Sequence, residues 1–185
     1  MKQRIITLNE FVEQKQINEA SKQVYDYSCL MVNVNTDGWD NFIHTLVDAN
    51  DLYTEEEDYG FETEPHVTVL YGLHADTDME KLKSMLPSLS TIELSSDAIS
   101  IFENPKYDVL KYDIQGDNLF KLNKEICENF EYTSDFPDYH PHITIAYLKP
   151  GCGKKYAKEL TEPKQFNPEV YTYSHTTGEK EFINI

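Results

Sequence analysis

Hydrophobic and polar residues follow two different periodicities along the chain. Partial alternation over Tyr25–Asn35 predicts a half-buried strand, and apolar residues at three- and four-residue intervals from Trp39 to Val47 predict a helix with one buried stripe. The helical spacing returns over 75–89 and 116–130. Segment 169–185 has two alternating runs around Thr-Gly, which predicts a hairpin. Strands and helices therefore share the chain, and the expected class is α+β.

The predicted elements come in a similar order in both halves of the chain: strand, helix, strand, helix and then further strands. Strands over 90–104 and 107–115 close the first half, whereas the lysine-bearing segment 149–160 shows only loop and helix-start chemistry. A length of 185 residues suits one compact core. We therefore expect a single domain over 25–185, preceded by an appendage over 1–24 that is helical in part.

The sequence pattern of one predicted strand occurs twice in the chain. EPHVTVLYG contains His66 and Thr68, and YHPHITIAYL contains His142 and Thr144, so each copy reads Pro-His, apolar, Thr, apolar. Because side chains alternate faces in a strand, each His shares a face with its Thr while the Val or Ile between them faces the core. The solvent side of a half-buried strand would explain one copy. Two matching copies favour a shared site between two equivalent strands.

The two pairs suit phosphodiester cleavage without a metal. Imidazole titrates near neutral pH, so one neutral His can accept a proton from an attacking hydroxyl while the other, protonated, donates one to the leaving oxygen. Each Thr hydroxyl can donate a hydrogen bond to a nonbridging phosphate oxygen. We therefore predict His66, Thr68, His142 and Thr144 as catalytic residues, and no cofactor or metal.

The paired P-H-[VI]-T-[VI] strands, in two halves of similar layout, resemble the two-histidine (2H) phosphoesterase superfamily, and the resemblance spans residues 25 to 185. It implies a bilobal fold of two pseudo-symmetric β-α-β-like lobes around a central cleft. It also implies hydrolysis or transesterification of 2′,3′-cyclic, 2′-5′ or cyclic-oligonucleotide phosphodiesters. In size and character the chain is similar to the phage anti-CBASS nucleases of this superfamily, which open cyclic di- and trinucleotide immune signals.

Composition narrows the expected partner and compartment. The chain has 33 acidic and 16 basic residues and a net charge of −17, and such a field repels long nucleic acids more than a small nucleotide held locally. Three distant cysteines without C-x-x-C spacing fit a reducing cytoplasm, and no apolar run is long enough to cross a bilayer. We expect a cytoplasmic protein, in the host cytoplasm if phage-encoded, that binds a small nucleotide or cyclic oligonucleotide. Its oligomeric state stays open.

Four further residues are candidates for substrate binding. Tyr25 or Tyr27 is the preferred stacking partner for a nucleobase if the first strand lines the site. Lys154, in GCGKK, offers a phosphate contact, with a solvated basic turn as the alternative. His140 lies two residues before His142 and is expected at the rim of the site or in a structural role.

Tyr71 and Tyr147 repeat together with the His-Thr pairs. Strict alternation turns both rings away from the His-Thr face, so we expect them to pack in the core.

Two other functions stay open. One is a 2′-5′ or 2′,3′-cyclic phosphodiesterase of RNA processing, and the other is a non-catalytic protein that sequesters a nucleotide. The intact His-Thr pairs argue against the second, since a binder has no evident need for two acid–base groups. The sequence leaves open which histidine is the base.

Overall fold

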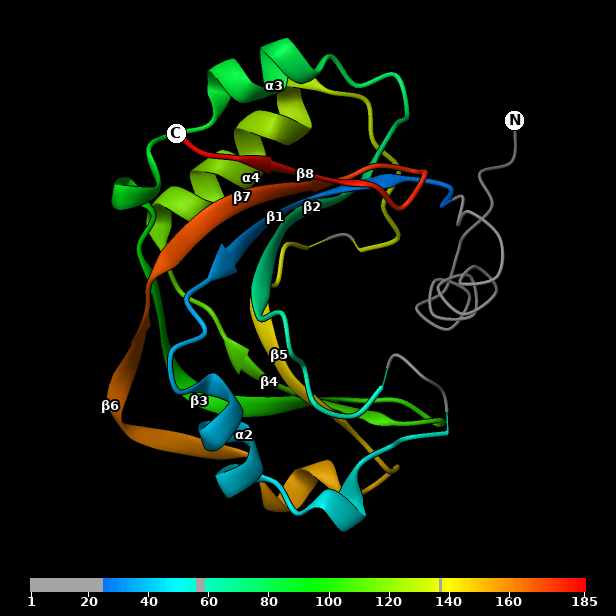
Figure 1. Ribbon diagram of the computed structural model, residues 1–185, viewed down its shortest axis with the longest axis vertical. Coiled ribbons are helices and arrows are strands. Elements are labelled where there is room, and N and C mark those ends of the chain that lie inside the picture. The colour runs from blue at the N-terminus through cyan, green and yellow to red at the C-terminus, as the bar shows by residue number, and fades with distance from the viewer. Residues whose placement is uncertain (1–24, 56–58, 137) are drawn as a thin grey trace.

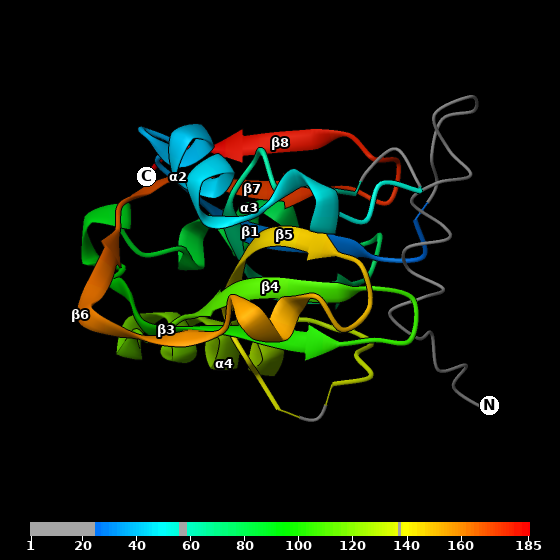
Figure 2. The ribbon, with the colours of Figure 1, turned by 90° about the horizontal axis from the view of Figure 1, so that it is seen from below.

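The central feature of the protein is one antiparallel sheet. A computed structural model describes residues 25–55, 59–136 and 138–185, and the predicted appendage over 1–24 lies outside them. The strands of the described part are β1 (Ser28–Val34), β2 (His66–Leu73), β3 (Leu94–Glu103), β4 (Asp108–Asp113), β5 (His142–Leu148), β6 (Lys158–Phe166), β7 (Pro168–Ser174) and β8 (Lys180–Ile183). They form one sheet in the order β6-β3-β4-β5-β2-β1-β7-β8. Figure 2 shows β4 lying between β3 and β5.

The helices cover one face of this sheet. They are α2 (Trp39–Leu46), α3 (Met79–Met85) and α4 (Asp117–Asn129), with 3-10 turns at Ala49–Asp51, Leu89–Thr91 and Gly153–Lys155. In Figure 1, α3 and α4 lie beside the half that holds β1 and β7, and α2 lies beside the half that holds β3 and β4. The buried side chains of Val67 and Ile143 join those of Ile43 and Leu122 in one apolar core. The expected α+β class is confirmed, and so is the hairpin of β7 and β8.

The sheet consists of two similar halves that meet between β2 and β5. β4, β3 and β6 follow outward from β5 as β1, β7 and β8 follow outward from β2. β2 and β5 pair at Val67 and Ile143, near the start of each strand, and then run in opposite directions away from this seam. The repeated strand therefore forms the boundary between two pseudo-symmetric lobes.

Each repeated strand is preceded by a segment that pairs with the far half of the other one. The amide of Tyr147 in β5 donates to the carbonyl of Gly60 at 2.7 Å, and the amide of Thr133 donates to the carbonyl of Gly72 in β2 at 2.9 Å. These two crossings tie the lobes together by backbone hydrogen bonds, although β2 and β5 share little of the ladder.

Helices α2 and α4 cross between the lobes in the same way. α2 follows β1 in the chain, yet its Phe42 ring stacks on Tyr112 of β4 with centroids 5.9 Å apart. α4 follows β4, yet its Asn123 donates to the carbonyl of Val69 in β2 at 2.8 Å. Helices α2 and α4 thus pack beneath the opposite lobe, which makes the two lobes one folding unit, whereas α3 follows β2 and stays beside the lobe of β1 and β7.

Strand β6 is not predicted by the sequence patterns. It begins in the segment expected to be a loop, contains Pro163 and is exposed over most of its length. It forms one edge of the sheet and pairs with β3 alone among the described strands. An edge strand needs only one row of ladder hydrogen bonds, so it tolerates Pro and lacks the apolar alternation of inner strands.

Gly72 is a position where the crossing segments leave no room for a side chain. Its φ is +104°, and a Cβ added there would lie 1.9 Å from the carbonyl oxygen of Thr133. We expect Gly72→Ala to lower the free energy of unfolding by about 3 kcal/mol, because left-handed strain is added to displacement of the crossing segment. Urea unfolding followed by circular dichroism measures the loss.

Gly151→Ala is the matched control. Its φ is also positive, at +80°, but no atom lies within 4 Å of the added Cβ. Backbone strain alone should cost about 1 kcal/mol there. Equal losses in the two variants would contradict the importance of the crossing contact.

Candidate active site

The two His-x-Thr pairs lie side by side at the seam, on the face opposite the helices. Val67 pairs with Ile143, so this antiparallel register places His66 across from Thr144 and Thr68 across from His142. Side chains directly opposite have Cβ atoms about 5 Å apart, and diagonal neighbours are about 7 Å apart. The two imidazoles are diagonal neighbours, a separation that one phosphate group between their ring nitrogens can span. All four side chains are half-buried.

Both imidazoles are held by the same hydrogen bond. His66 Nδ1 lies 2.8 Å from the carbonyl oxygen of Glu64, and His142 Nδ1 lies 2.9 Å from the carbonyl oxygen of His140. A carbonyl oxygen only accepts, so Nδ1 carries a proton and donates in each ring. Nε2 is then the nitrogen left to exchange a proton with a substrate.

The repeated proline explains how the two rings come to be held alike. Pro65 and Pro141 stand between each His and the carbonyl that binds its Nδ1, and the pyrrolidine ring fixes φ at that position. The carbonyls of these prolines accept from the amides of Val34 at 3.1 Å and Ile114 at 2.9 Å, which are equivalent residues of β1 and β4. The proline before each His therefore helps to fix the orientation of the imidazole ring.

His142 lies in an environment that favours its neutral form. Burial lowers the pKa of His142, and the positive charges of Lys111 and His66 lower it further, while the hydrogen bond to the His140 carbonyl and the charge of Asp113 act in the opposite direction. A neutral ring with a proton on Nδ1 has a free lone pair on Nε2, which is what a general base requires.

Lys111 is a site residue that sequence reasoning missed. It pairs across β4 and β5 with Thr144, and Asp113 pairs with His142, so both lie on the His-Thr face. The Lys111 ammonium donates to Ser100 Oγ at 2.7 Å and to Asp113 Oδ1, and it lies 4.1 Å from the centroid of Phe102. The sequence signal for it was a lysine within the predicted strand 107–115. That this lysine lies beside Thr144 follows from the pairing of β4 with β5.

The corresponding positions of the other lobe carry no charge. Asn33 pairs with His66 and Met31 pairs with Thr68, in the places that Asp113 and Lys111 occupy beside His142 and Thr144. The amide oxygen of Asn33 accepts from the buried Thr172 hydroxyl at 2.7 Å. The site is thus symmetric in its four central residues and asymmetric in the next row.

The prediction that Tyr71 and Tyr147 turn away from the His-Thr face is wrong, although Tyr147 does pack against a buried hydrophobic cluster. The registers shift within both repeated strands, so that Val69 in β2 and Ile145 in β5 are extra residues opposite β1 and β4. Such a β-bulge interrupts the alternation of faces. Tyr71 therefore pairs with Cys29, and Tyr147 packs in an aromatic cluster with Tyr53, Tyr59, Tyr107 and Val109, on the same face as the His-Thr pairs.

Cys29 lies beside Thr68 but does not qualify as a nucleophile. Burial raises its pKa to about 12, and a hydrogen bond with the Thr68 side chain only partly offsets this. The thiolate is the reactive form of cysteine, and it is scarce at neutral pH in such a site.

The four predicted binding residues are placed differently. Tyr27 stacks on His74 at 5.9 Å and meets Tyr71 edge-on at 6.2 Å, while Tyr25 is joined to Thr176 through its backbone amide. Tyr27 thus lies on the His-Thr face beside Tyr71, directly before the start of β1.

His140 and Lys154 do not bring their side chains to the His-Thr pairs. His140 is exposed and contributes its backbone carbonyl to His142. Lys154 forms an ion pair with Glu103 at 2.6 Å. Glu103 follows Phe102 by one residue and so points to the opposite face of β3.

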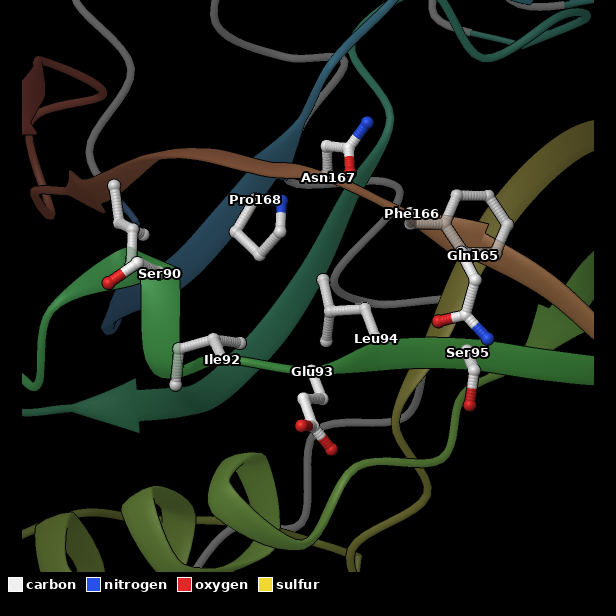
Figure 3. A pocket seen from close by; sticks show the side chains of 10 residues that line it. Ser90, Ile92, Glu93, Leu94, Ser95, Gln165, Phe166, Asn167 and Pro168 are labelled. Carbon is white, nitrogen blue, oxygen red and sulfur yellow. The ribbon is translucent and has the colours of Figure 1, made fainter.

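A pocket of about 620 Å³ opens elsewhere, between the start of β3 and the β6–β7 junction. Figure 3 shows Glu93 and Ser95 on one side of it and Gln165, Phe166 and Pro168 on the other. Its lining contains none of the predicted site residues and no histidine, so we place the candidate active site at the seam.

Two searches of the described residues gave negative results. No group of three or more His, Cys, Asp or Glu side chains there is arranged to hold a metal ion. None of the helices in that part of the chain is both long enough and apolar enough to span a membrane.

Comparison with known proteins agrees with the geometry of the seam. The family model described as the 2'-5' RNA ligase superfamily matches residues 32–170, well over half of the chain and both His-x-Thr strands. No curated protein gave a significant match. The chain therefore belongs to the 2'-5' RNA ligase superfamily, within the 2H phosphoesterase superfamily, and is a phosphoesterase of that general kind.

Proposed function

We propose that the protein cleaves a cyclic oligonucleotide signal, or a related small nucleotide, by metal-independent acid–base catalysis with His66 and His142. The observation that carries the proposal is the pair of half-buried imidazoles at the seam, each donating Nδ1–H to a carbonyl and leaving Nε2 for substrate. Removal of an immune signal, as by the anti-CBASS nucleases, is the biological role that this activity would serve.

In the proposed reaction, one imidazole accepts the proton of the attacking hydroxyl at Nε2 while the new P–O bond forms. The other, as imidazolium, donates its Nε2 proton to the oxygen whose bond to phosphorus breaks. The hydroxyls of Thr68 and Thr144 donate hydrogen bonds to the nonbridging oxygens, where negative charge grows in the transition state.

The charge of the protein supports a compact substrate. A net charge of −17 opposes the approach of a long polyanion, whereas a nucleotide with a few phosphates is repelled less strongly.

The test is a product profile. The purified protein is incubated in EDTA with cyclic di- and trinucleotides, with linear 2′-5′ oligonucleotides and with 2′,3′-cyclic phosphates. Cleavage of the cyclic oligonucleotides is the expected result. If every substrate in the panel survives, the catalytic proposal is refuted.

An RNA-processing phosphodiesterase is the second candidate, and the description of the matched family favours it. Cleavage of only the linear 2′-5′ or 2′,3′-cyclic substrates would establish it. Stoichiometric binding of an unchanged cyclic nucleotide in calorimetry would instead identify a protein that sequesters its ligand.

Truncation of either histidine should separate catalysis from binding. We expect His66→Ala and His142→Ala to keep the fold and most of the nucleotide affinity while turnover falls by about 10²–10⁴-fold, because one proton transfer loses its partner. His44→Ala, at an exposed ring of α2, is the control and should keep full activity. Undiminished turnover in either site variant would refute the assigned role.

The threonine hydroxyls should contribute to the rate more than to binding. Val keeps the shape of Thr and removes only the donor, so Thr68→Val and Thr144→Val should each lower kcat by about 10²-fold with a smaller change in KM. Steady-state kinetics measures both parameters. Thr161→Val, on the exposed edge strand β6, controls for the substitution itself; a purely elevated KM in the site variants would argue for a binding role instead.

A further inference from the structure

The next row of residues around the His-Thr pairs breaks the symmetry of the site. Beside Thr144 and His142 stand Lys111 and Asp113, whereas beside Thr68 and His66 stand Met31 and Asn33. The equivalence of these positions extends to the next strand of each lobe: Ser100 in β3 pairs with Lys111, and Thr172 in β7 pairs with Met31. A cation and an anion in one lobe thus replace two neutral side chains in the other.

The ammonium of Lys111 is fully engaged by protein groups. Only 6% of the side chain is exposed, and its three N–H donors face Ser100 Oγ, the Asp113 carboxylate and the ring of Phe102. The same Phe102 ring meets His142 edge-on with centroids 5.1 Å apart. Lys111 therefore lacks a free donor for a phosphate oxygen and acts on the site through its neighbours.

We propose that Lys111, fixed by Asp113 and Ser100, is a positioning residue that keeps the His142 ring neutral and thereby makes His142 the general base and His66 the general acid. The inference rests on the proposed function and adds direction to it. The proton of the attacking hydroxyl moves to Nε2 of His142, and the leaving oxygen takes its proton from Nε2 of His66.

Three charged groups act on the His142 ring. Lys111 and Asp113 come from β4 and His66 comes from β2, while β3 contributes the uncharged Phe102. Burial and the two cations lower the pKa of His142, and Asp113 opposes them. The ion pair with Lys111 holds the Asp113 carboxylate, which would otherwise stabilise the imidazolium.

The experiment converts the charged lobe into its neutral counterpart one residue at a time. Lys111→Met copies Met31, and Asp113→Asn copies Asn33. The acidic limb of the kcat/KM–pH profile reports the base of the free enzyme. This limb should move up by about one pH unit in Lys111→Met, because the Asp113 charge then raises the pKa of His142 without opposition. It should move down in Asp113→Asn, because the Lys111 charge then lowers that pKa without opposition. In the double variant it should return close to its original position.

A second readout works without any substrate. NMR titration of the His142 ring in the ligand-free protein, assigned by comparison with His142→Gln, should show the same opposite displacements. Lys121→Met, at an exposed lysine of α4, should displace neither the ring titration nor the activity limb. Asp113 is 46% exposed, so Asp113→Asn tests the coupling even if loss of the buried lysine prevents folding.

The outcomes separate this inference from the proposed function. Failure to cleave any nucleotide refutes the proposed function, and the ring titration still decides whether Lys111 and Asp113 control His142. Displacement of the ring titration without displacement of the activity limb would overturn His142 as the base. Unchanged titration in both variants, or displacement in the same direction, would overturn the role of Lys111.

Discussion

The site depends on the antiparallel pairing of Val67 with Ile143. Because side chains in a strand have a period of two, this single register puts both His-Thr pairs on one face and the residues between them in the core beneath. A slip of one residue in either strand would bury a histidine and a threonine and expose apolar residues. The burial of Val67 and Ile143, both 0% exposed, therefore fixes the relative position of two imidazoles whose sequence numbers differ widely.

The four central residues could be predicted because the features that place them are local to each copy of the repeated strand. His and Thr at i and i+2 share a face in any strand, and proline before each His fixes the carbonyl that holds the ring. The layout of two lobes followed from the repeated order of strand and helix. What the sequence did not reveal was that α2 and α4 pack beneath the opposite lobe, since that depends on contacts such as Phe42 with Tyr112, far apart in the chain.

The misplaced residues share a physical cause. A β-bulge at Val69 adds one residue before Tyr71, and another at Ile145 adds one before Tyr147, so a rule of strict alternation assigns both tyrosines to the wrong face. Nothing in the local composition marks a bulge, because it arises from pairing with β1 and β4. Lys111 was missed for a related reason: its place beside Thr144 is a property of the ladder between β4 and β5.

A site with perfect twofold symmetry would have an ambiguity that its chemistry must remove. Two neighbouring imidazoles repel each other's charge, so they tend to share one proton, but symmetry leaves either ring equally able to hold it. Burial of His142, together with the Lys111 cation beside it, favours the neutral form of that ring by lowering its pKa. A buried ammonium is costly without a partner, and Asp113 supplies that partner while its own charge opposes Lys111 at His142. Lys111 and Asp113 therefore act on the pKa of His142 in opposite directions, and removal of either charge leaves the other unopposed.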